Sequence, residues 1–214
     1  MHIIRLALSF MLIITVAGAT LAARTPLSYL DLRYTNVIEQ SNEYTCGAAA
    51  VGTLLTYFYG IPTSETDILN VIYESMHARG EEPKQGQGLT AYDLKEALKA
   101  KGITSKGFLV KPAALQDYFS RGGLPVIIHL TKPEKHFEVA AGMIEGQIVI
   151  ADPSWGRSVT PLNLLVKQRG YDGIVLVPIP ASEIADQVAV QQQETIQWAT
   201  LHLGQLSRLR ECLP

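Results

Sequence analysis

Two residue types in this sequence, a cysteine and a histidine, could together attack a carbonyl group. Cys46 is followed by Gly47 and by a run of small, apolar and aromatic residues that predicts a buried helix over residues 47–59. A thiol attacks as the thiolate, and the unpaired N–H groups of a helix N-terminus favour that form. Because Cys46 lies at the predicted start of this helix, it is a candidate nucleophile. The alternative is an inert buried cysteine, which is common among free cysteines.

A thiolate nucleophile requires a base, and the position of His136 suits that role. His136 directly precedes the apolar run 137–144, so it lies at the mouth of a predicted strand, where a side chain can face a cleft. His129 falls inside another predicted strand, 124–130, where a histidine more often packs against a neighbour. His136 is therefore the preferred base.

Asp152 could orient the imidazole of the base, as the third member of a catalytic triad does. It follows the predicted strand 147–151, and residues 145–146 suit a tight hairpin turn. This hairpin would bring Asp152 and His136 to the same edge of the sheet. Because Pro153 comes next, a simple turn-forming role for the aspartate is the alternative.

Gln40 precedes Cys46 by six residues and could donate its amide N–H₂ to a developing oxyanion, beside the backbone N–H of Cys46. Other chemistries lack their sequence patterns. There is no HExxH motif and no cluster of His and Cys ligands, so no metal is expected. There is no Rossmann glycine pattern and no ATP-binding P-loop, so no cofactor is expected.

The elements that must position these residues change character along the chain. Apolar periodicity and capping residues predict helices at 47–59, 65–76, 91–101 and 113–121. Short β-branched runs predict strands at 103–110, 124–130, 137–144, 147–151 and 173–177, and residues 30–38 alternate loosely, as a strand or an extended lead-in. Helices followed by an antiparallel sheet indicate an α+β domain. Residues 181–214, which are polar, Gln-rich and then Leu-rich, are expected to form an appended helical tail.

The composition indicates one globular domain rather than a disordered or nucleic-acid-binding protein. The 214 residues are 47% hydrophobic and 18% charged, and they are enough for one sizeable core. The formal net charge is −2 and no run of Lys or Arg stands out, which argues against a nucleic-acid partner.

The first residues have the pattern of a secretory signal peptide. Arg5 precedes an apolar run, 6–16, and small residues follow, which predicts cleavage after Ala19 or Ala22. We therefore expect residues 1–22 to be a signal peptide and the mature protein to be periplasmic or extracellular. An uncleaved membrane anchor is the alternative, although the run is short for a spanning helix. The rest of the sequence contains no apolar run long enough to span a bilayer, so the mature protein is not expected to cross one.

The sequence contains two cysteines, Cys46 and Cys212. In an oxidising compartment they could form one disulfide, which would disable a nucleophile at Cys46. A structural disulfide is therefore an alternative to a nucleophilic role for Cys46.

Taken together, the motifs resemble the C39 family of cysteine peptidases, the bacteriocin-processing relatives of papain, over roughly residues 37–178. The pattern consists, in chain order, of Gln40, Cys46-Gly47-Ala48-Ala49, Leu124-Pro125-Val126-Ile127, His136-Phe137-x-Val139 and Asp152-Pro153 with Gly156. The resemblance implies a papain-like peptidase domain over residues 30–180, with the cysteine at a helix N-terminus packed on an antiparallel sheet. It also implies the roles of nucleophile for Cys46, general base and acid for His136, orienting acid for Asp152 and oxyanion donor for Gln40.

The sequence departs from the transporter-linked members of that family. The sequence shows no P-loop pattern and no predicted membrane domain, and residues 1–22 are expected to be an export signal. It therefore looks like the exported, stand-alone branch, one member of which accompanies a bacterial functional-amyloid secretion system. The resemblance implies a cysteine-type endopeptidase whose partner is a protein or peptide substrate, such as an amyloid or another secretion-system component. A non-catalytic C39-like binding module or secretion chaperone is the alternative, against which the retained Cys46 argues.

Overall fold

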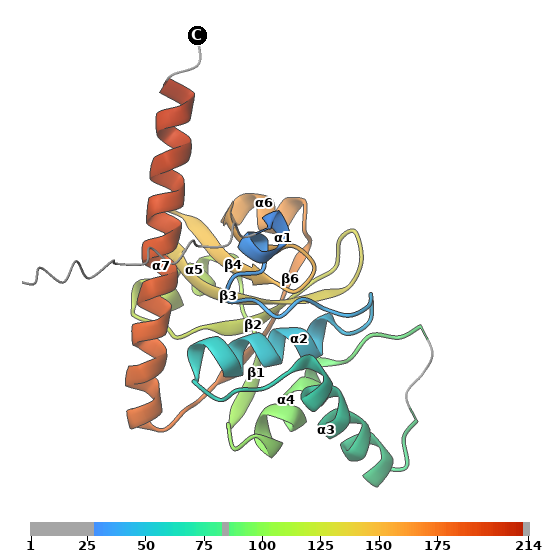
Figure 1. The fold of residues 1–214 in the computed structure, drawn as a ribbon. Helices are drawn as coiled ribbons and strands as arrows, with labels where there is room; N and C mark the ends of the chain where they lie inside the picture. The colour runs from blue at the N-terminus through green and yellow to red at the C-terminus, as the bar shows by residue number, and fades with distance from the viewer. Residues whose placement is uncertain (1–27, 83–85, 212–214) are drawn as a thin grey trace, which may run out of the picture.

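The structure is a computed structural model that describes residues 28–82 and 86–211 (Figure 1). The expected signal peptide, 1–22, and Cys212 lie outside the described residues. Within them, Cys46 is a free, buried cysteine.

A six-stranded antiparallel sheet forms the centre of the fold, with strand order β1-β6-β2-β3-β4-β5 (Figure 1). The strands are β1 Ser105–Leu109, β2 Val126–Leu130, β3 His136–Ile144, β4 Gln147–Asp152, β5 Gly156–Pro161 and β6 Tyr171–Pro178. The helices are α1 Tyr29–Arg33, α2 Cys46–Thr53, α3 Glu65–Ala78, α4 Ala91–Ala100, α5 Pro112–Ser120, α6 Leu162–Lys167 and α7 Ser182–Glu211, with a π-helical turn, η1 Leu54–Phe58, directly after α2.

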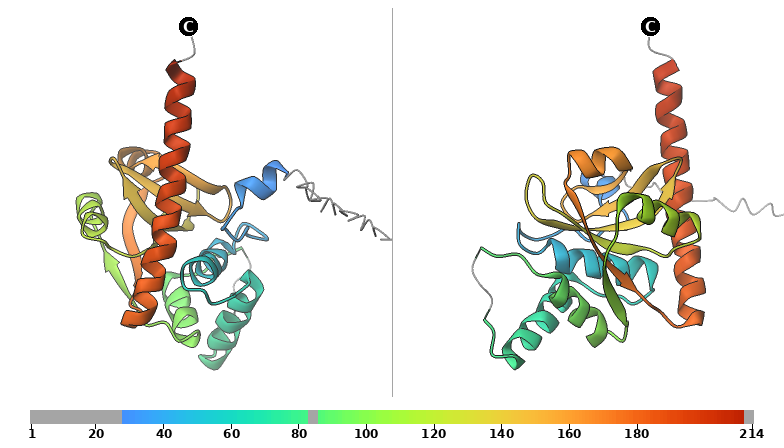
Figure 2. Two further views of the ribbon diagram at one scale, coloured as in Figure 1. Left: turned by 60° about the vertical axis from the view of Figure 1, so that its left-hand side comes forward. Right: turned by 180° about the vertical axis from the view of Figure 1, so that it is seen from behind.

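Both faces of the sheet are covered, and each carries its own hydrophobic cluster. One cluster joins the sheet to α2, α3, α4 and α7, and the other joins it to α5 and α6. Figure 2 shows α5 on the side of the sheet that faces away from α2. Along β2, Ile127 contributes to the first cluster while Val126 and Ile128 contribute to the second. Burial on both faces explains why the central strands read as nearly continuous apolar runs.

Helix α2 lies directly against the sheet because it is built from small residues. All eight of its residues are buried, and Ala48, Ala49 and Ala50 have no exposed surface. The predicted helix 47–59 is thus present as α2 followed by η1, which ends at Phe58, two residues before Gly60, whose φ is +66°. The π-helical turn has no distinct sequence signal.

The N-terminal segment differs from the sequence-based expectation. Residues 30–38 are not a strand, because Tyr29–Arg33 form the short helix α1 and turns follow. The Ser28 hydroxyl accepts a hydrogen bond from the Asp31 N–H, and the Asp31 carboxylate accepts one from the Ser28 N–H. This capping box satisfies two backbone donors locally and outweighs the loose alternation of apolar residues.

Besides α1, two elements were not predicted from the sequence, strand β5 and helix α6. Strand β5 pairs with β4 at the edge of the sheet, and five of its six residues are only half-buried. Its sequence, GRSVTP, is therefore more polar than that of the central strands. Edge position removes the strong apolar signal on which strand prediction depends.

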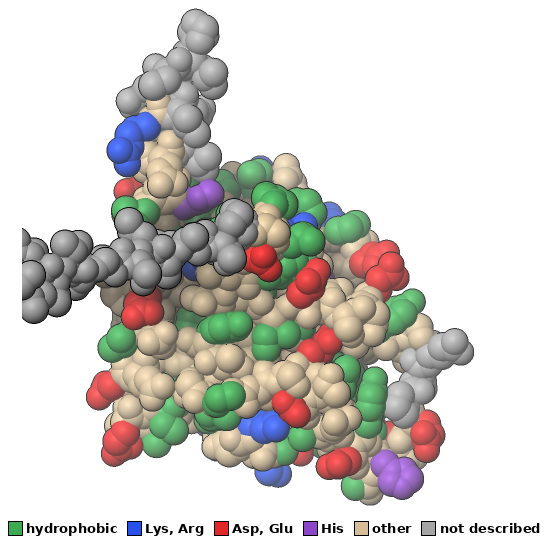
Figure 3. All heavy atoms as spheres, in the orientation of Figure 1, with side chains coloured by type: hydrophobic (Ala, Val, Ile, Leu, Met, Phe, Trp, Pro, Cys, Tyr) green, Lys and Arg blue, Asp and Glu red, His purple; other side chains and the backbone are tan. Residues whose placement is uncertain are grey.

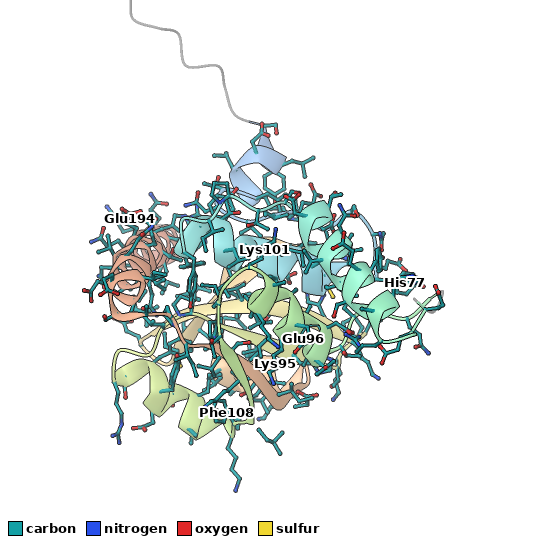
Figure 4. All side chains as sticks on the ribbon, turned by 90° about the horizontal axis from the view of Figure 1, so that it is seen from below. His77, Lys95, Glu96, Lys101, Phe108 and Glu194 are labelled. Atoms are coloured by element: carbon teal, nitrogen blue, oxygen red, sulfur yellow. The ribbon has the colours of Figure 1, made fainter. Side chains whose placement is uncertain are left out.

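Helix α7 is a single 30-residue helix whose first half packs on the body of the protein and whose end projects beyond it (Figure 1). Gln192 of this helix is 8% exposed and donates hydrogen bonds to the carbonyl oxygens of Gly123, at 2.8 Å, and Ala141, at 2.9 Å. Figure 4 shows Glu194 of α7 and His77 of α3 at opposite sides of the molecule. Among the described residues, none of the helices combines the length and the apolar character needed to cross a membrane.

Candidate active site

Cys46 and His136 meet where the start of α2 faces the start of β3. Cys46 is the first residue of α2 and is 4% exposed, and His136 is the first residue of β3. His136 Nε2 lies 2.7 Å from Asp152 Oδ1. His136 also forms a hydrogen bond with Cys46. Because Nε2 is engaged by the carboxylate, the ring nitrogen that faces the thiol is Nδ1.

The surroundings of His136 favour its charged form. Burial alone would lower the pKa of this imidazole, but the hydrogen bonds and charges of Asp152 and Cys46 raise it to about 10. The ring therefore carries a proton on both nitrogens in neutral solution. An imidazolium beside a cysteine is the arrangement that stabilises a thiolate.

Asp152 is a buried carboxylate, and both of its oxygens accept hydrogen bonds. Its Oδ1 also accepts hydrogen bonds from the backbone N–H and the hydroxyl of Ser154, both at 2.8 Å, and its Oδ2 accepts one from Arg169 Nη2 at 3.1 Å. Burial would raise the pKa of Asp152, but the hydrogen bond with His136, the charge of His136 and the contacts with Ser154 hold it below its usual range. Asp152 is therefore ionised and fixes a proton on His136 Nε2.

The hairpin between β3 and β4 brings His136 and Asp152 together. Glu145 and Gly146 form its turn, and both have positive φ, +48° and +75°. The register then shifts between Ala140 and Gly142, where β3 carries one extra residue. This bulge moves Asp152 beside Glu138 rather than Val139, and so onto the same side of the strand as His136.

Gln40 lies next to this group, although its amide is engaged elsewhere. Its backbone N–H donates to the Pro153 carbonyl oxygen at 3.0 Å, and its Nε2 donates to the Asn42 carbonyl oxygen at 2.9 Å. Its Oε1 is buried and has no hydrogen-bond partner among the described residues. The following residue, Ser41, donates its N–H to the buried Glu65 at 2.9 Å. The Gln40 segment is thus fixed between the turn after Asp152 and helix α3.

Two further charged residues of the site, Glu138 and Arg169, were not anticipated from the sequence. Arg169 Nη2 donates to Glu138 Oε2 at 3.0 Å as well as to Asp152. A glutamate inside the apolar run 137–144 is a signal that could have been noticed. Arg169 carries no such signal, since it lies in a polar turn before Gly170.

The ligand-type atoms of His136, Glu138 and Asp152 all lie within 4.8 Å of one another, as the ligands of a metal ion would. Arg169 donates a hydrogen bond to both carboxylates, so the guanidinium already supplies positive charge at this position.

A cleft of about 760 Å³ opens beside Thr45, the residue before the cysteine. Much of its lining comes from α3, α4 and the segment before α2, and includes Tyr44, Thr45, Tyr73, Met76, Leu89 and Tyr92. On the other side of the site, Arg33 of α1 donates hydrogen bonds to the carbonyl oxygens of Ser154 and Trp155, at 2.9 and 2.7 Å. The face in Figure 3 carries scattered acidic side chains and few Lys or Arg.

Comparison with known proteins shows similarity to peptidases. A sequence profile described as the Peptidase C39 family matches residues 34–183. The chain is 27% identical over 164 residues to the "Probable functional amyloid protease FapD" of Pseudomonas aeruginosa, covering 76% of this chain and 68% of that protein. The protein of the same name from Pseudomonas fluorescens is 26% identical over 166 residues, covering 77% and 70%.

Two solved structures share the fold. The peptidase domain of Streptococcus ComA, a bifunctional ABC transporter of a quorum-sensing pathway, has a TM-score of 0.56 at 21% identity, covering 68% of this chain and 98% of that domain. A double-glycine-motif protease from an AMS/PCAT transporter, in complex with the leader peptide, has a TM-score of 0.52 at 25% identity, covering 68% and 91%. The predicted α+β papain-like fold is thus confirmed, and the chain belongs to the peptidase C39 family.

Proposed function

We propose that this peptidase is an exported cysteine endopeptidase, with Cys46 as nucleophile and His136 as general base and acid. The observation that carries the proposal is the group formed by Cys46, the charged His136 and the buried, ionised Asp152. The Cys46 thiolate attacks the carbonyl carbon of the scissile peptide bond, and the carbonyl oxygen becomes an oxyanion. Asp152 holds the ring of His136 throughout.

The remaining steps use the same ring. His136 donates its proton to the leaving amine, the carbon–nitrogen bond breaks, and a thioester with Cys46 remains. His136 then accepts a proton from water, which attacks the thioester and releases the acid and the thiolate. The backbone N–H of Cys46 and the amide of Gln40 are the proposed oxyanion donors. Rotation of the Gln40 amide would free Nε2 from Asn42 and give the unpaired Oε1 a new position.

The proposed substrate is a secreted or leader-bearing protein. The printed name of the Pseudomonas relatives refers to functional amyloid, and the AMS/PCAT protease was solved with a leader peptide. By analogy, an amyloid or another secretion-system component is the proposed partner here. The cleft beside Thr45, with its tyrosine and methionine side chains, offers contacts to apolar residues of such a peptide.

The test of catalysis replaces the nucleophile. The full chain is co-expressed with a candidate secreted substrate, and processing is followed by the mass of the substrate. Cys46→Ala and the near-isosteric Cys46→Ser should abolish processing, while Cys212→Ser should retain it. Unchanged processing by Cys46→Ala would exclude the peptidase role. A binding module or chaperone would instead retain substrate capture without any cleavage in the wild type.

The same preparations test export and the state of the thiol. Protein from the periplasmic fraction should begin after Ala19 or Ala22, and its mass under non-reducing conditions should show two free thiols. An intact N-terminus in the membrane fraction would support the anchor instead. A disulfide in every molecule would support the structural role of Cys46.

A further inference from the structure

A second buried carboxyl group and a guanidinium lie behind Asp152, on the side away from the thiol. Glu138 has no exposed surface, and the side chain of Arg169 is 32% exposed. A single nitrogen of Arg169, Nη2, donates to Glu138 Oε2 at 3.0 Å and to Asp152 Oδ2 at 3.1 Å. The peptidase mechanism proposed above leaves both residues without a role.

We propose that Glu138 and Arg169 are positioning residues that fix the carboxylate of Asp152, and through it the ring of His136. This inference rests on the proposed function. The two oxygens of Asp152 have separate partners, since Oδ1 faces His136 and Ser154 while Oδ2 faces Arg169. Without Arg169, Oδ2 would be a buried charged oxygen that lacks its charged donor. Such a carboxylate would rotate or take up a proton, and either change weakens its hold on His136.

Glu138 completes this arrangement as a neutral acid. The charged groups that face it are His136 on its own strand, Asp152 from β4 and Arg169 from the segment after α6, while β2 presents Ile128 opposite it. Burial and the charge of Asp152 raise the pKa of Glu138 to about 8, although Arg169 and His136 oppose the change.

The protonation state of Glu138 determines how Asp152 is held. Glu138 Oε1 is buried and accepts no hydrogen bond from the described residues. In the protonated acid, the O–H can donate to Asp152, the carboxylate with which Glu138 interacts. The charge of Arg169 is then committed to Asp152 alone. Above about pH 8, an ionised Glu138 would compete with Asp152 for the same guanidinium.

The reactivity of Cys46 separates this role from a purely structural one. An ion pair that only stabilises the fold would change the melting temperature and leave the pH profile of the thiol unchanged. A group that positions Asp152 changes that profile, because Asp152 sustains the imidazolium that sustains the thiolate.

The experiment measures alkylation of Cys46 by iodoacetamide from pH 4 to 10, by intact mass, in the mature chain carrying Cys212→Ser so that one thiol is read. Arg169→Gln should move the acidic midpoint of labelling up by about one pH unit and slow labelling at pH 6 about 10-fold. Arg169→Lys should recover at least half of that shift. In the wild type, ionisation of Glu138 should add a second, alkaline inflection to the labelling profile near pH 8, because the ionised group competes for Arg169. Glu138→Gln, which imitates the neutral acid, should keep the acidic midpoint and lose this alkaline inflection.

The matched control is Asp172→Asn, which removes the carboxylate of another histidine pair of the same sheet. It should leave the profile unchanged. The inference is overturned if Arg169→Gln retains the wild-type profile while labelling of Cys46 is fast and depends on His136. In that case the proposed function stands. Should Arg169→Gln fail to fold, persistence of the alkaline inflection in Glu138→Gln overturns the inference. Slow labelling of Cys46 in the wild type, independent of His136, removes both proposals.

Discussion

Two histidine–carboxylate pairs lie on adjacent strands of the sheet and share the same contact distance. His136 Nε2 on β3 lies 2.7 Å from Asp152, and His129 Nδ1 on β2 lies 2.7 Å from Asp172. The carboxylates differ, because the side chain of Asp152 is 2% exposed and that of Asp172 is 28% exposed. Asp152 is held by an arginine and a serine, whereas the other oxygen of Asp172 accepts a backbone N–H, that of Ile174.

The rings differ as well. The ring of His136 faces Cys46 and carries a pKa raised to about 10, because the hydrogen bonds and charges of Asp152 and Cys46 outweigh its burial. The ring of His129 packs against that of Phe137, with 4.8 Å between the centroids. A short histidine–aspartate contact therefore does not define an active site. The His136 pair differs in having a cysteine on one side of the ring and, on the other, a buried carboxylate that is held by an arginine.

Removal of each ring should give the largest contrast. We expect His136→Ala to slow alkylation of Cys46 at pH 6 by roughly 100-fold or more, because a thiol without its imidazolium partner is mostly protonated at that pH. His129→Ala should change the rate less than about threefold, since the His129 ring packs on Phe137. The rates are measured by intact mass with Cys212→Ser as background. Equal losses in the two variants would mean that the pairs are not functionally distinct.

Removal of each carboxylate should give a smaller contrast. Asp152→Asn replaces a charged acceptor by an amide, so the pKa of His136 should fall and labelling of Cys46 at pH 6 should slow by about 10-fold. Asp172→Asn should stay within about twofold of the wild type. Urea unfolding of both variants controls for loss of structure. A full rate in Asp152→Asn would contradict the orienting role.

The pH dependence of stability should give the smallest contrast. The folded pKa of His136 is raised, so its contribution to stability is complete below about pH 6.5 and is lost as the pH rises toward 10. The folded pKa of Asp152 is lowered, so its contribution is present above about pH 3.9 and is lost in acid.

Because of the His136 proton, the free energy of unfolding should decline above about pH 6.5, by up to ~1.4 kcal/mol per pH unit. Glu138, whose folded pKa is also raised, adds a decline that ends near pH 8. Urea titrations at pH 6 and pH 9 measure the slope. It should be shallower in His136→Ala and retained in His129→Ala; the same slope in wild type and His136→Ala would show that the imidazolium adds no stability.

The sequence was informative where a residue's position depends on its near neighbours. Cys46 begins a helix because small apolar residues follow it, and a two-residue turn brings the strand ends that carry His136 and Asp152 to the same edge of the sheet. These features allowed the juxtaposition to be predicted before the fold was known. The preference for His136 over His129 followed from the same reasoning, because one histidine begins its strand and the other lies inside one.

The parts that could not be predicted depend on contacts between distant segments. Arg169 reaches Glu138 and Asp152 across 31 and 17 residues, and a polar turn gives no hint of that. The extra residue in β3 directly precedes Gly142, and a glycine inside a strand pattern is a bulge signal that the strand prediction did not use. Which residue the bulge would bring opposite Asp152 still depends on the paired strand. Helix α1 was mistaken for an extended segment because its capping box was overlooked.

The contact of Gln192 with Ala141 has a consequence for how far this protein can be shortened. Ala141 is the bulged residue of β3, and its carbonyl oxygen depends on a side chain from α7. The span that matches the family profile ends at residue 183, almost at the start of that helix. A chain cut there would remove the donor of the Gly123 and Ala141 carbonyl oxygens and would expose the part of the hydrophobic cluster that Val188 and Ala199 of α7 cover. The limit of family resemblance and the limit of the cooperative folding unit are therefore different places in this chain.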